Sequence, residues 1–386
     1  MKIEDLALQR SKYKHLTDNE WRWFLQQVEG RERTADKLPT FAAIDDWWYP
    51  VRLSCEQCSS ELAARYKASL ISIDRLSRAN FKFQISNFAD LTGGYGVDTY
   101  FLSEHFEHTD YVEQNAELCR IAAHNFADKP ISVHNTSAEE FLKTADQYDL
   151  IFLDPARRDS HGNKVFRLED CTPNVVELLP TLLAHLTEDG RILLKLSPML
   201  DLTQAIKSLS TFNFQLSTLH WDIYVVAIKN EVKEVLLLSG GTGQITAIDL
   251  DKKDQAFVFT REEESNSVAN FNFHLSPFTF LYEPSAAILK AGAYKLIAAR
   301  FGLHKLDVNT HLYASDALVP DFPGRVWKIN GERLAVRGER ANVLVRNYPL
   351  TPDALKKKLH LRDGGSAFVI GCRVGGKPMV FWAERV

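Results

Sequence analysis

The fold is decided by residues 87–98, which read Asn87-Phe88-Ala89-Asp90-Leu91-Thr92-Gly93-Gly94-Tyr95-Gly96-Val97-Asp98. A short apolar run ends in an acid, and three glycines follow within four residues before a helix-like segment. Glycine lets a strand turn sharply into a helix beside a ligand, because a Cβ atom would block the dihedral angles or the contact. The stretch therefore predicts a ligand-binding loop, although an ordinary tight turn would also use glycine.

Two further acids follow strand-like runs later in the chain. Glu113 ends the run that starts at His108, and Asp154 follows the apolar residues 148–153. In an open α/β sheet, the carboxyl ends of parallel strands meet at one edge, where ligands bind. With a third strand expected at 131–134, the sequence predicts that Asp90, Glu113 and Asp154 end the first, second and fourth strands and converge on one crevice.

The charges around the glycine loop favour a cationic ligand over a pyrophosphate. A dinucleotide loop has the pattern Gly-x-Gly-x-x-Gly, but Thr99 stands where the last glycine is required. Asp90 lies just ahead of the loop, where a carboxylate repels phosphates and attracts amino or sulfonium groups. The pattern therefore favours S-adenosylmethionine as the cofactor.

These ordered segments resemble the class I S-adenosylmethionine-dependent methyltransferases over roughly residues 80 to 260. Three further stretches resemble a bacterial type with a C-terminal THUMP-like domain: Asp154-Pro155-Ala156-Arg157-Arg158, Lys195-Leu196-Ser197-Pro198 and Tyr282-Glu283-Pro284-Ser285-Ala286-Ala287. The resemblance implies an α/β fold with a Rossmann-like seven-stranded sheet, an N-terminal helical segment, and a C-terminal α+β region. The implied domains are a helical segment at 1–78, the methyltransferase domain at 79–265, a ferredoxin-like module at 270–319 and a basic THUMP-like domain at 320–386.

The resemblance also implies roles for single residues. The expected cofactor-binding residues are Asp90, Thr92, Gly93, Gly94, Gly96, Glu113, Gln114 and Asp154, with Glu113 on the ribose. Asp154 and Pro155 are expected to be catalytic, next to the methyl acceptor. Members that methylate amino groups commonly carry Asp-Pro-Pro-Tyr, whose aromatic ring stacks on a flipped base. Ala156 and Arg157 stand at those last two positions, so the acceptor atom stays open.

Arg157, Arg158 and Lys195 are the predicted substrate-binding residues. The two arginines could hold a phosphate bidentately or pair with neighbouring acids. Lys195 follows three apolar residues and is expected at the end of the fifth strand, where it could face the substrate or solvent.

The composition suggests a chain with more than one core and no membrane segment. Its 386 residues are 45% hydrophobic and contain no apolar run of 18 residues. No leader-like N-terminus is present, so we expect a cytoplasmic enzyme. Five cysteines fit a reducing compartment, and Cys55-x-x-Cys58 lacks a second ligand pair, so no metal is expected.

The first 78 residues are expected to form helices at 5–9, 19–29 and 54–79. Their aromatic residues are concentrated at Trp21, Trp23, Phe24, Trp47, Trp48 and Tyr49. These rings could stack on nucleic acid bases, but we favour packing of the helices onto the main domain. Farther along, strands are expected at 222–228, 233–238 and 255–261, a polar linker at 262–267, and one helix at 284–299.

Charge is distributed unevenly along the chain. Residues 320–386 hold 13 Lys and Arg against 6 Asp and Glu, a net charge of +7, whereas the residues before them carry −11. The basic set includes Arg333, Arg337, Arg340, Arg346, Lys356, Lys357 and Lys358. A basic module lets an acidic enzyme engage a polyanion, so RNA, transfer or ribosomal, is the predicted partner and substrate. Lys356, Lys357 and Lys358 could instead be the solvated face of a helix.

Three functions remain open at this stage. The first is an RNA methyltransferase in which positioning dominates catalysis and Asp154 accepts a hydrogen bond or a proton. The second is a methyltransferase acting on a small molecule or a protein. The third is a noncatalytic RNA-binding protein that retains the cofactor pocket.

Overall fold

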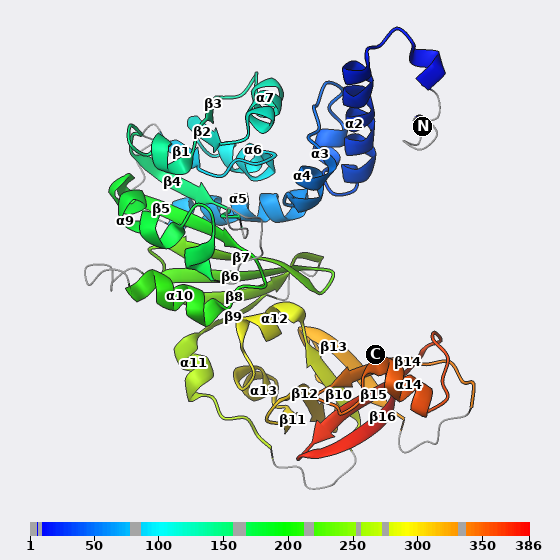
Figure 1. Ribbon diagram of the computed structural model, residues 1–386. Helices are drawn as coiled ribbons and strands as arrows, with labels where there is room; N and C mark the ends of the chain where they lie inside the picture. Colours follow the sequence, from blue (N-terminus) through cyan, green and yellow to red (C-terminus); the bar gives the residue numbers. More distant parts are fainter. Residues whose placement is uncertain are drawn as a thin grey trace. The chain divides into compact units, whose positions relative to one another are not determined.

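The computed structural model describes residues 6, 10–77, 86–156, 167–211, 220–251, 256–271, 278–330 and 337–386. The chain divides into two compact units (Figure 1). Unit 1 comprises Met1–Leu219 and Leu236–Gly240, and unit 2 comprises His220–Val235 and Gly241–Val386. Among the described residues, no helix is long and apolar enough to cross a membrane.

Unit 1 begins with helices, as predicted. They are η1 (Arg10–Tyr13), α2 (Asp18–Thr34), α3 (Pro39–Ala42), α4 (Arg52–Gln57) and α5 (Glu61–Ser77). The long helix α2 starts in a capping box, in which Thr17 and Glu20 satisfy each other's backbone N–H groups. The helix predicted at 19–29 is confirmed, whereas the stretch at 54–79 is divided at residues 58–60 between α4 and α5, and residues 78 and 79 lie outside the described part of the chain. Of the stretch at 5–9, only Leu6 is described.

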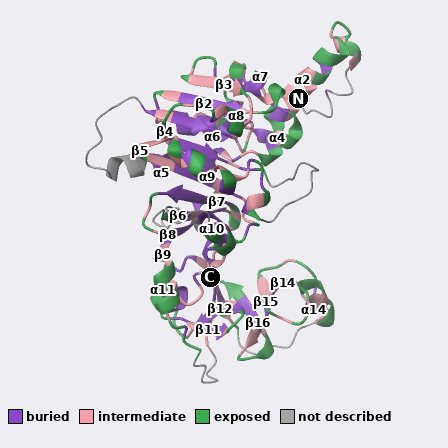
Figure 2. Ribbon diagram, turned by 60° about the vertical axis from the view of Figure 1, so that its left-hand side comes forward, coloured by how far each residue is buried: buried purple, intermediate pink, exposed green. Residues whose placement is uncertain are grey.

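The sheet of unit 1 is parallel and buried. Its strands are β1 (Asn87–Asp90), β2 (His108–Glu113), β3 (Ile131–Asn135), β4 (Tyr148–Leu153) and β5 (Leu186–Leu196), in the order β3-β2-β1-β4-β5. All their pairings are parallel, and the last residues of β7 (Glu231–Ser239) follow β5 in the sheet order. Nearly every residue of β4 is buried (Figure 2), because helices cover a parallel sheet on both faces. The expected strand positions are therefore confirmed.

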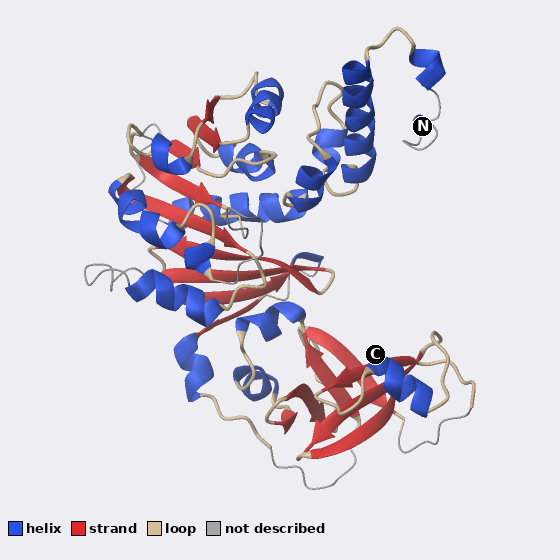
Figure 3. Ribbon diagram, in the orientation of Figure 1, coloured by secondary structure: helices blue, strands red, loops and turns tan. Residues whose placement is uncertain are grey.

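Helices alternate with these strands (Figure 3). They are α6 (Val97–Ser103), α7 (Ala116–Asn125), α8 (Ala138–Phe141), the 3-10 turn η2 (Leu168–Asp170), α9 (Val175–Ala184) and α10 (Leu202–Thr211). Asn115 and Asn174 cap α7 and α9, since each side chain accepts hydrogen bonds from two N–H groups of the first helical turn. The direction of strand order reverses between β1 and β4, and such switch points are where ligands bind in this kind of sheet.

Unit 2 holds the remaining strands of this sheet, which has nine strands in its order and not the seven that were predicted. After β6 (Trp221–Ile228) and the start of β7 come β8 (Gln244–Asp249) and β9 (Phe257–Thr260), in the order β7-β6-β8-β9. Strand β8 pairs parallel with β6 and antiparallel with β9. The strands expected at 222–228, 233–238 and 255–261 are thus present.

A second, seven-stranded sheet also belongs to unit 2. It contains β10 (Phe280–Pro284), β11 (His304–Asp307), β12 (Thr310–Ser315), β13 (Gly324–Ile329), β14 (Asn342–Arg346), β15 (Ala367–Val374) and β16 (Lys377–Arg385), in the order β11-β12-β10-β13-β16-β15-β14. Its pairings are antiparallel except for that of β14 with β15. Strand β13 pairs with β10 on one side and β16 on the other, so the regions 270–319 and 320–386 share one sheet.

The helices of unit 2 correct two expectations. The predicted linker at 262–267 is instead α11 (Arg261–Asn266), which a Thr260–Glu263 capping box starts. The single helix expected at 284–299 is two helices, α12 (Ala286–Ala291) and α13 (Leu296–Phe301). Gly292 ends α12 with a φ of 85°, a left-handed conformation that glycine adopts without strain. A third helix, α14 (Pro352–Lys358), carries the predicted lysine run.

Candidate functional site

The glycine loop joins β1 to α6 and presses against two aromatic rings. A Cβ atom on Gly93 would lie 2.1 Å from a ring carbon of Tyr111, and one on Gly96 would lie 2.5 Å from Phe126. Gly96 also has a φ of 81°, which disfavours any other residue. These two glycines are therefore required by packing and backbone geometry before any ligand is considered.

Asp90 is the last residue of β1, and its buried carboxylate forms hydrogen bonds with Thr92 of the loop and Thr99 of α6. Its carboxylate accepts hydrogen bonds from the Thr92 N–H at 3.0 Å and the Thr99 hydroxyl at 2.6 Å. The residue is 1% exposed, and this burial raises the pKa of Asp90 to about 7, even though both hydrogen bonds oppose the rise. A nearby cation would favour the ionised form of this carboxyl group.

Glu113 ends β2 and holds the loop from the neighbouring strand. It accepts hydrogen bonds from the Gly94 N–H at 2.9 Å and from the Asn115 N–H at 2.8 Å. The Tyr111 hydroxyl donates to the Gly94 carbonyl at 2.5 Å, so both peptide groups of Gly94 are fixed from β2. Gln114 follows as an exposed residue beside the acid.

Asp154 follows β4 and completes the acidic edge. Its backbone N–H donates to the Thr92 hydroxyl at 2.6 Å, and its Oδ2 accepts from Lys195 Nζ at 2.5 Å. Pro155 comes next and is buried. Thr92 thus links Asp90 to Asp154, and the structure brings the three predicted acids to one edge of the sheet.

Lys195 lies near the end of β5, as predicted, and belongs to a network of buried charges. Its Nζ is 3.5 Å from Asp98 of α6, and Asp98 also lies 3.1 Å from Lys67 of α5. Lys67 is 0% exposed. Burial alone would raise the pKa of Asp98, but the two ammonium groups and the hydrogen bond from Ser59 hold it below its usual value.

Sequence reasoning missed Asp98 and Lys67, although a signal for each exists. Lys67 stands among Ala63, Ala64, Ala68 and Ile71 on one buried face of α5. A lysine at an apolar helical position needs a buried partner, and an acid in the helix after a glycine loop is a candidate.

The N-terminal aromatic residues also contact the loop. The Trp47 indole N–H donates to the hydroxyl of Tyr95, which stands between Gly94 and Gly96, at 2.9 Å. Trp48 stacks on His124 of α7 at a ring distance of 3.7 Å. Packing of the N-terminal helices onto the sheet domain, the favoured interpretation, is confirmed, and the segment also fixes the glycine loop.

Other predicted groups lie elsewhere. Arg157 and Arg158 fall outside the described residues, so their pairing stays open. Cys55 and Cys58 are largely buried, and burial raises the pKa of each thiol. In the described part of the chain, no group of three or more His, Cys, Asp or Glu side chains could hold a metal ion.

We call Asp90, the glycine loop, Glu113, Asp154 and Lys195 the edge site. Its donor set suits a cofactor with cationic and hydroxyl groups. Glu113 can accept from ribose hydroxyls, the carboxylates of Asp90 and Asp154 can attract cations, and the bare glycine backbone allows close approach. The residues present therefore fit S-adenosylmethionine.

Comparison with known proteins identifies relatives of both parts of the chain. Family models match a ferredoxin-like domain at residues 280–323 and a THUMP domain-like region at 328–385. The crystal structure of a protein from Porphyromonas gingivalis W83, named as a methyltransferase, is similar with a TM-score of 0.79 and 30% identity, over 96% of this chain and 92% of that one.

Two curated proteins of Mycobacterium tuberculosis, from the strains CDC 1551 / Oshkosh and ATCC 25618 / H37Rv, are also similar. Each is named an uncharacterized S-adenosylmethionine-dependent methyltransferase, and each is 26% identical over 240 residues. The match covers 58% of this chain and 60% of each relative, so the chain spans less than two thirds of their length.

Proposed function

Because the chain belongs to the S-adenosylmethionine-dependent methyltransferases with ferredoxin-like and THUMP-like domains at the C-terminus, we propose that it methylates a nucleotide of RNA. The fold class and the cofactor follow from this membership. The observation that carries the RNA substrate is the net charge of +7 on residues 320–386, the region of the THUMP-like domain.

The basic side chains of this domain support phosphate contacts. Arg337, Arg340, Lys357 and Lys358 are exposed and form no ion pair among the described residues. Arg346 differs, because it pairs with Glu283, and Lys356 pairs with Asp353 and Asp363. Arg333 lies outside the described residues.

In the proposed reaction, the bound cofactor supplies an activated methyl group on its sulfonium. The chain's own residues position the reactants: the glycine loop, Thr92, Glu113 and Gln114 would hold the cofactor, while Asp90 supports the loop and attracts the amino group. Lys195 occupies Oδ2 of Asp154, and Oδ1 accepts no hydrogen bond from the described residues. Asp154 Oδ1 would accept a hydrogen bond or proton from the acceptor, next to Pro155, while Lys195 holds the other carboxylate oxygen in place.

The substrate-binding side of the proposal includes Arg157, Arg158 and Lys195. Two arginines directly after the catalytic turn would place guanidinium groups where a nucleotide phosphate approaches. Lys195 is about one-tenth exposed, so its ammonium group acts mainly through Asp154.

The test measures methyl transfer from labelled S-adenosylmethionine to total cellular RNA by the full chain. We expect Asp154→Ala to lower the rate by about 10²- to 10⁴-fold and to weaken cofactor binding by a much smaller factor. Asp146→Ala, the same change at an exposed acid just before β4, is the matched control and should have no effect.

RNA binding is measured separately as a function of salt. Phosphate contacts give a steep salt slope, and Lys357→Ala with Lys358→Ala should reduce that slope by about 2. No RNA binding at low salt would overturn the RNA substrate and favour a small-molecule or protein acceptor. Cofactor and RNA binding without methyl transfer to any RNA would favour a noncatalytic RNA-binding protein.

A further inference from the structure

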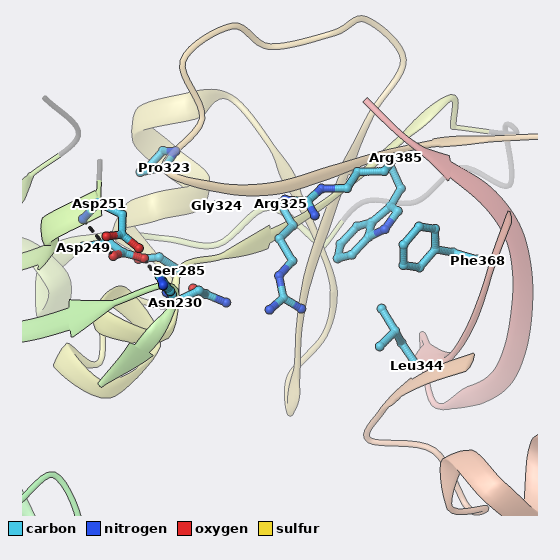
Figure 4. Close-up of a pocket in the computed structure, with 12 residues that line it drawn as sticks. Asn230, Asp249, Asp251, Ser285, Pro323, Gly324, Arg325, Leu344, Phe368 and Arg385 are labelled. Carbon is cyan, nitrogen blue, oxygen red and sulfur yellow. Dashed lines mark hydrogen bonds between the residues drawn. The ribbon is translucent and has the colours of Figure 1, made fainter. Parts of the chain in front are cut away.

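Unit 2 contains a pocket of about 330 Å³, and none of the residues that line it belongs to the edge site. Such a volume is within the range of small-molecule sites. It is lined by Lys229, Asn230, Asp249, Asp251, Ser285, Pro323, Gly324, Arg325, Trp327, Leu344, Phe368 and Arg385. We call it the arginine pocket (Figure 4).

One side of the pocket is apolar and comes from the seven-stranded sheet. Trp327 of β13, Leu344 of β14 and Phe368 of β15 line it, and the Trp327 and Phe368 rings meet edge to face at 6.3 Å. This side offers aromatic and aliphatic surface to a planar ligand.

Two guanidinium groups flank this apolar side. Arg385 of β16 is directly opposite Trp327 in the sheet register, and Arg325 is two residues before Trp327, so all three share a face. Arg325 lies 3.5 Å from Glu283, whose carboxylate also pairs with Arg346. The Arg385 side chain forms no ion pair or hydrogen bond with the described residues. The positive charge on this face therefore exceeds the negative charge, and it is available to an anion.

The opposite side is polar and held by hydrogen bonds. In Figure 4, Asn230, Asp249, Asp251 and Ser285 lie across the pocket from Arg385, Phe368 and Leu344. The Asn230 N–H donates to Asp249 at 2.6 Å, and the Asn230 side-chain oxygen accepts from the Ala286 N–H at 2.8 Å. The Asn230 amide N–H₂ and the Asp251 carboxylate keep hydrogen-bonding capacity within the described part of the chain.

A buried donor also lines the pocket without a partner. Trp327 is 1% exposed, and its indole N–H finds no acceptor among the residues that the structure describes. Buried donors are almost always satisfied, so an unmatched one at a pocket suggests that a ligand or its water supplies the acceptor.

We propose that the arginine pocket binds one nucleotide. Arg325 and Arg385 hold the phosphate, and the base lies against Phe368 and Trp327. The Asn230 amide N–H₂ donates to the base edge, and the Asp251 carboxylate accepts from it. A bare phosphate would leave the aromatic side unused, and an apolar ligand would leave the Arg385 guanidinium group unpaired. The nucleotide is either a free mononucleotide or one unit of an RNA chain, and only the second source rests on the proposed function.

The test is calorimetric titration of the full chain with CMP, UMP, GMP and AMP, with excess S-adenosylmethionine present to fill the edge site. Ribose 5-phosphate and inorganic phosphate are titrated for comparison. We expect at least one mononucleotide to bind more tightly than ribose 5-phosphate, and Arg385→Ala to weaken it about 10-fold or more. Lys377→Ala is the control, because it removes the same charge from an exposed position at the other end of β16.

Two further variants guard against a folding defect. Arg325→Lys keeps the positive charge but loses the planar guanidinium group that can donate two parallel hydrogen bonds. Trp327→Phe keeps an aromatic ring but loses the indole N–H. Each variant should weaken nucleotide binding several-fold without changing the melting temperature. A short oligoribonucleotide that competes with the mononucleotide identifies RNA as the source, and one that does not compete identifies the free nucleotide.

No mononucleotide binding with a Kd below about 1 mM would overturn the proposal. Equal weakening by Arg385→Ala and Lys377→Ala would also overturn it, since only general charge attraction would remain. If RNA methylation persists while nucleotide binding is absent, the pocket assignment fails and the proposed function stands. If nucleotide binding is present without RNA methylation, the pocket assignment stands and the proposed function fails.

Discussion

The edge site of unit 1 and the arginine pocket of unit 2 differ in the burial and pairing of their charged side chains. In the edge site, Lys195 pairs with the neighbouring buried Asp98, which also pairs with the buried Lys67, and Asp90 is buried among hydrogen bonds. In the arginine pocket, Arg385 is exposed and makes no ion pair with any described residue.

This difference indicates two kinds of pre-organisation. A buried charge must be paired within the protein, because its desolvation is costly, so the edge site is rigid before any ligand arrives. An exposed charge on a rigid sheet keeps its hydration until a ligand replaces it, so the pocket gains its pairing only on binding. We therefore expect mutations in the first site to act on stability and mutations in the second to act on affinity.

The largest expected effect is on stability, from Asp98→Asn. It removes the carboxylate that lies 3.1 Å from the fully buried Lys67 ammonium, which should lower the free energy of unfolding by about 3–5 kcal/mol. Arg385→Ala should change it by less than about 0.5 kcal/mol. Urea unfolding measures the loss of stability in both variants. Equal losses would contradict the proposed difference between the two sites.

The control for Asp98→Asn is the pair Lys67→Met with Asp98→Leu. Replacing both charges with apolar side chains leaves neither charge of this pair in the interior, so most of the lost stability should return. A double variant as unstable as Asp98→Asn would show that shape, and not charge, is what the site requires.

The next effect is steric, from Gly93→Ala. Its Cβ would overlap the ring of Tyr111, which is fully buried and cannot withdraw, at a cost of about 1–3 kcal/mol and at least a 10-fold loss of cofactor affinity. Gly94→Ala has no atom closer than 3.8 Å to its Cβ and should cost about 1 kcal/mol through its positive φ alone. Melting temperatures and calorimetry compare the two, and a larger stability loss at Gly94 would contradict the packing argument.

A moderate effect is expected from pH. The pKa of Asp90 is raised to about 7, and a cationic cofactor lowers it again, so binding favours the deprotonated carboxyl group. Affinity for S-adenosylmethionine should therefore rise as pH increases toward 7, by up to about 10-fold per unit, and level off above it. Calorimetry between pH 5.5 and about 8.5 measures this profile.

Asp90→Asn is the control for the pH profile and should flatten it. Nucleotide affinity at the arginine pocket should stay level above about pH 7, because guanidinium groups keep their charge there. If the affinity for S-adenosylmethionine were also independent of pH, the Asp90 carboxylate would not contribute to attracting the cofactor's positive charge.

The smallest expected effect is that of Tyr111→Phe. The ring that supports Gly93 remains, but the hydrogen bond to the Gly94 carbonyl is lost, which should cost about 1 kcal/mol, or roughly 5-fold in cofactor affinity. Nucleotide binding at the arginine pocket should not change. An unaltered cofactor affinity would show that packing alone positions the loop.

Local patterns were sufficient to predict strands β1 to β5 and the acidic edge. Asp90, Glu113 and Asp154 each follow an apolar run, and a parallel sheet brings such strand ends together whatever the rest of the chain does. Lys195 was predictable for the same reason. Their individual roles stay proposals, as do the domain boundaries expected at 78, 265 and 319.

Features that depend on packing between distant segments were not predictable. The pairing of Lys67 with Asp98 requires α5 to pack on α6, and the arginine pocket collects Asn230, Arg325 and Arg385 from strands and turns far apart in sequence. The division of 284–299 into two helices was visible at Gly292, but alanine-rich flanks favoured one continuous helix.

Strand β13 ties together the two C-terminal regions that the family models match. It lies largely between the two family-model matches and forms hydrogen-bonded ladders with β10 on one side and β16 on the other. Severing the chain beside it would expose an unpaired strand edge on at least one fragment, and such edges recruit other chains. We therefore expect the ferredoxin-like and THUMP-like regions to be inherited together, and to fold after transfer to another protein only when they are transferred together.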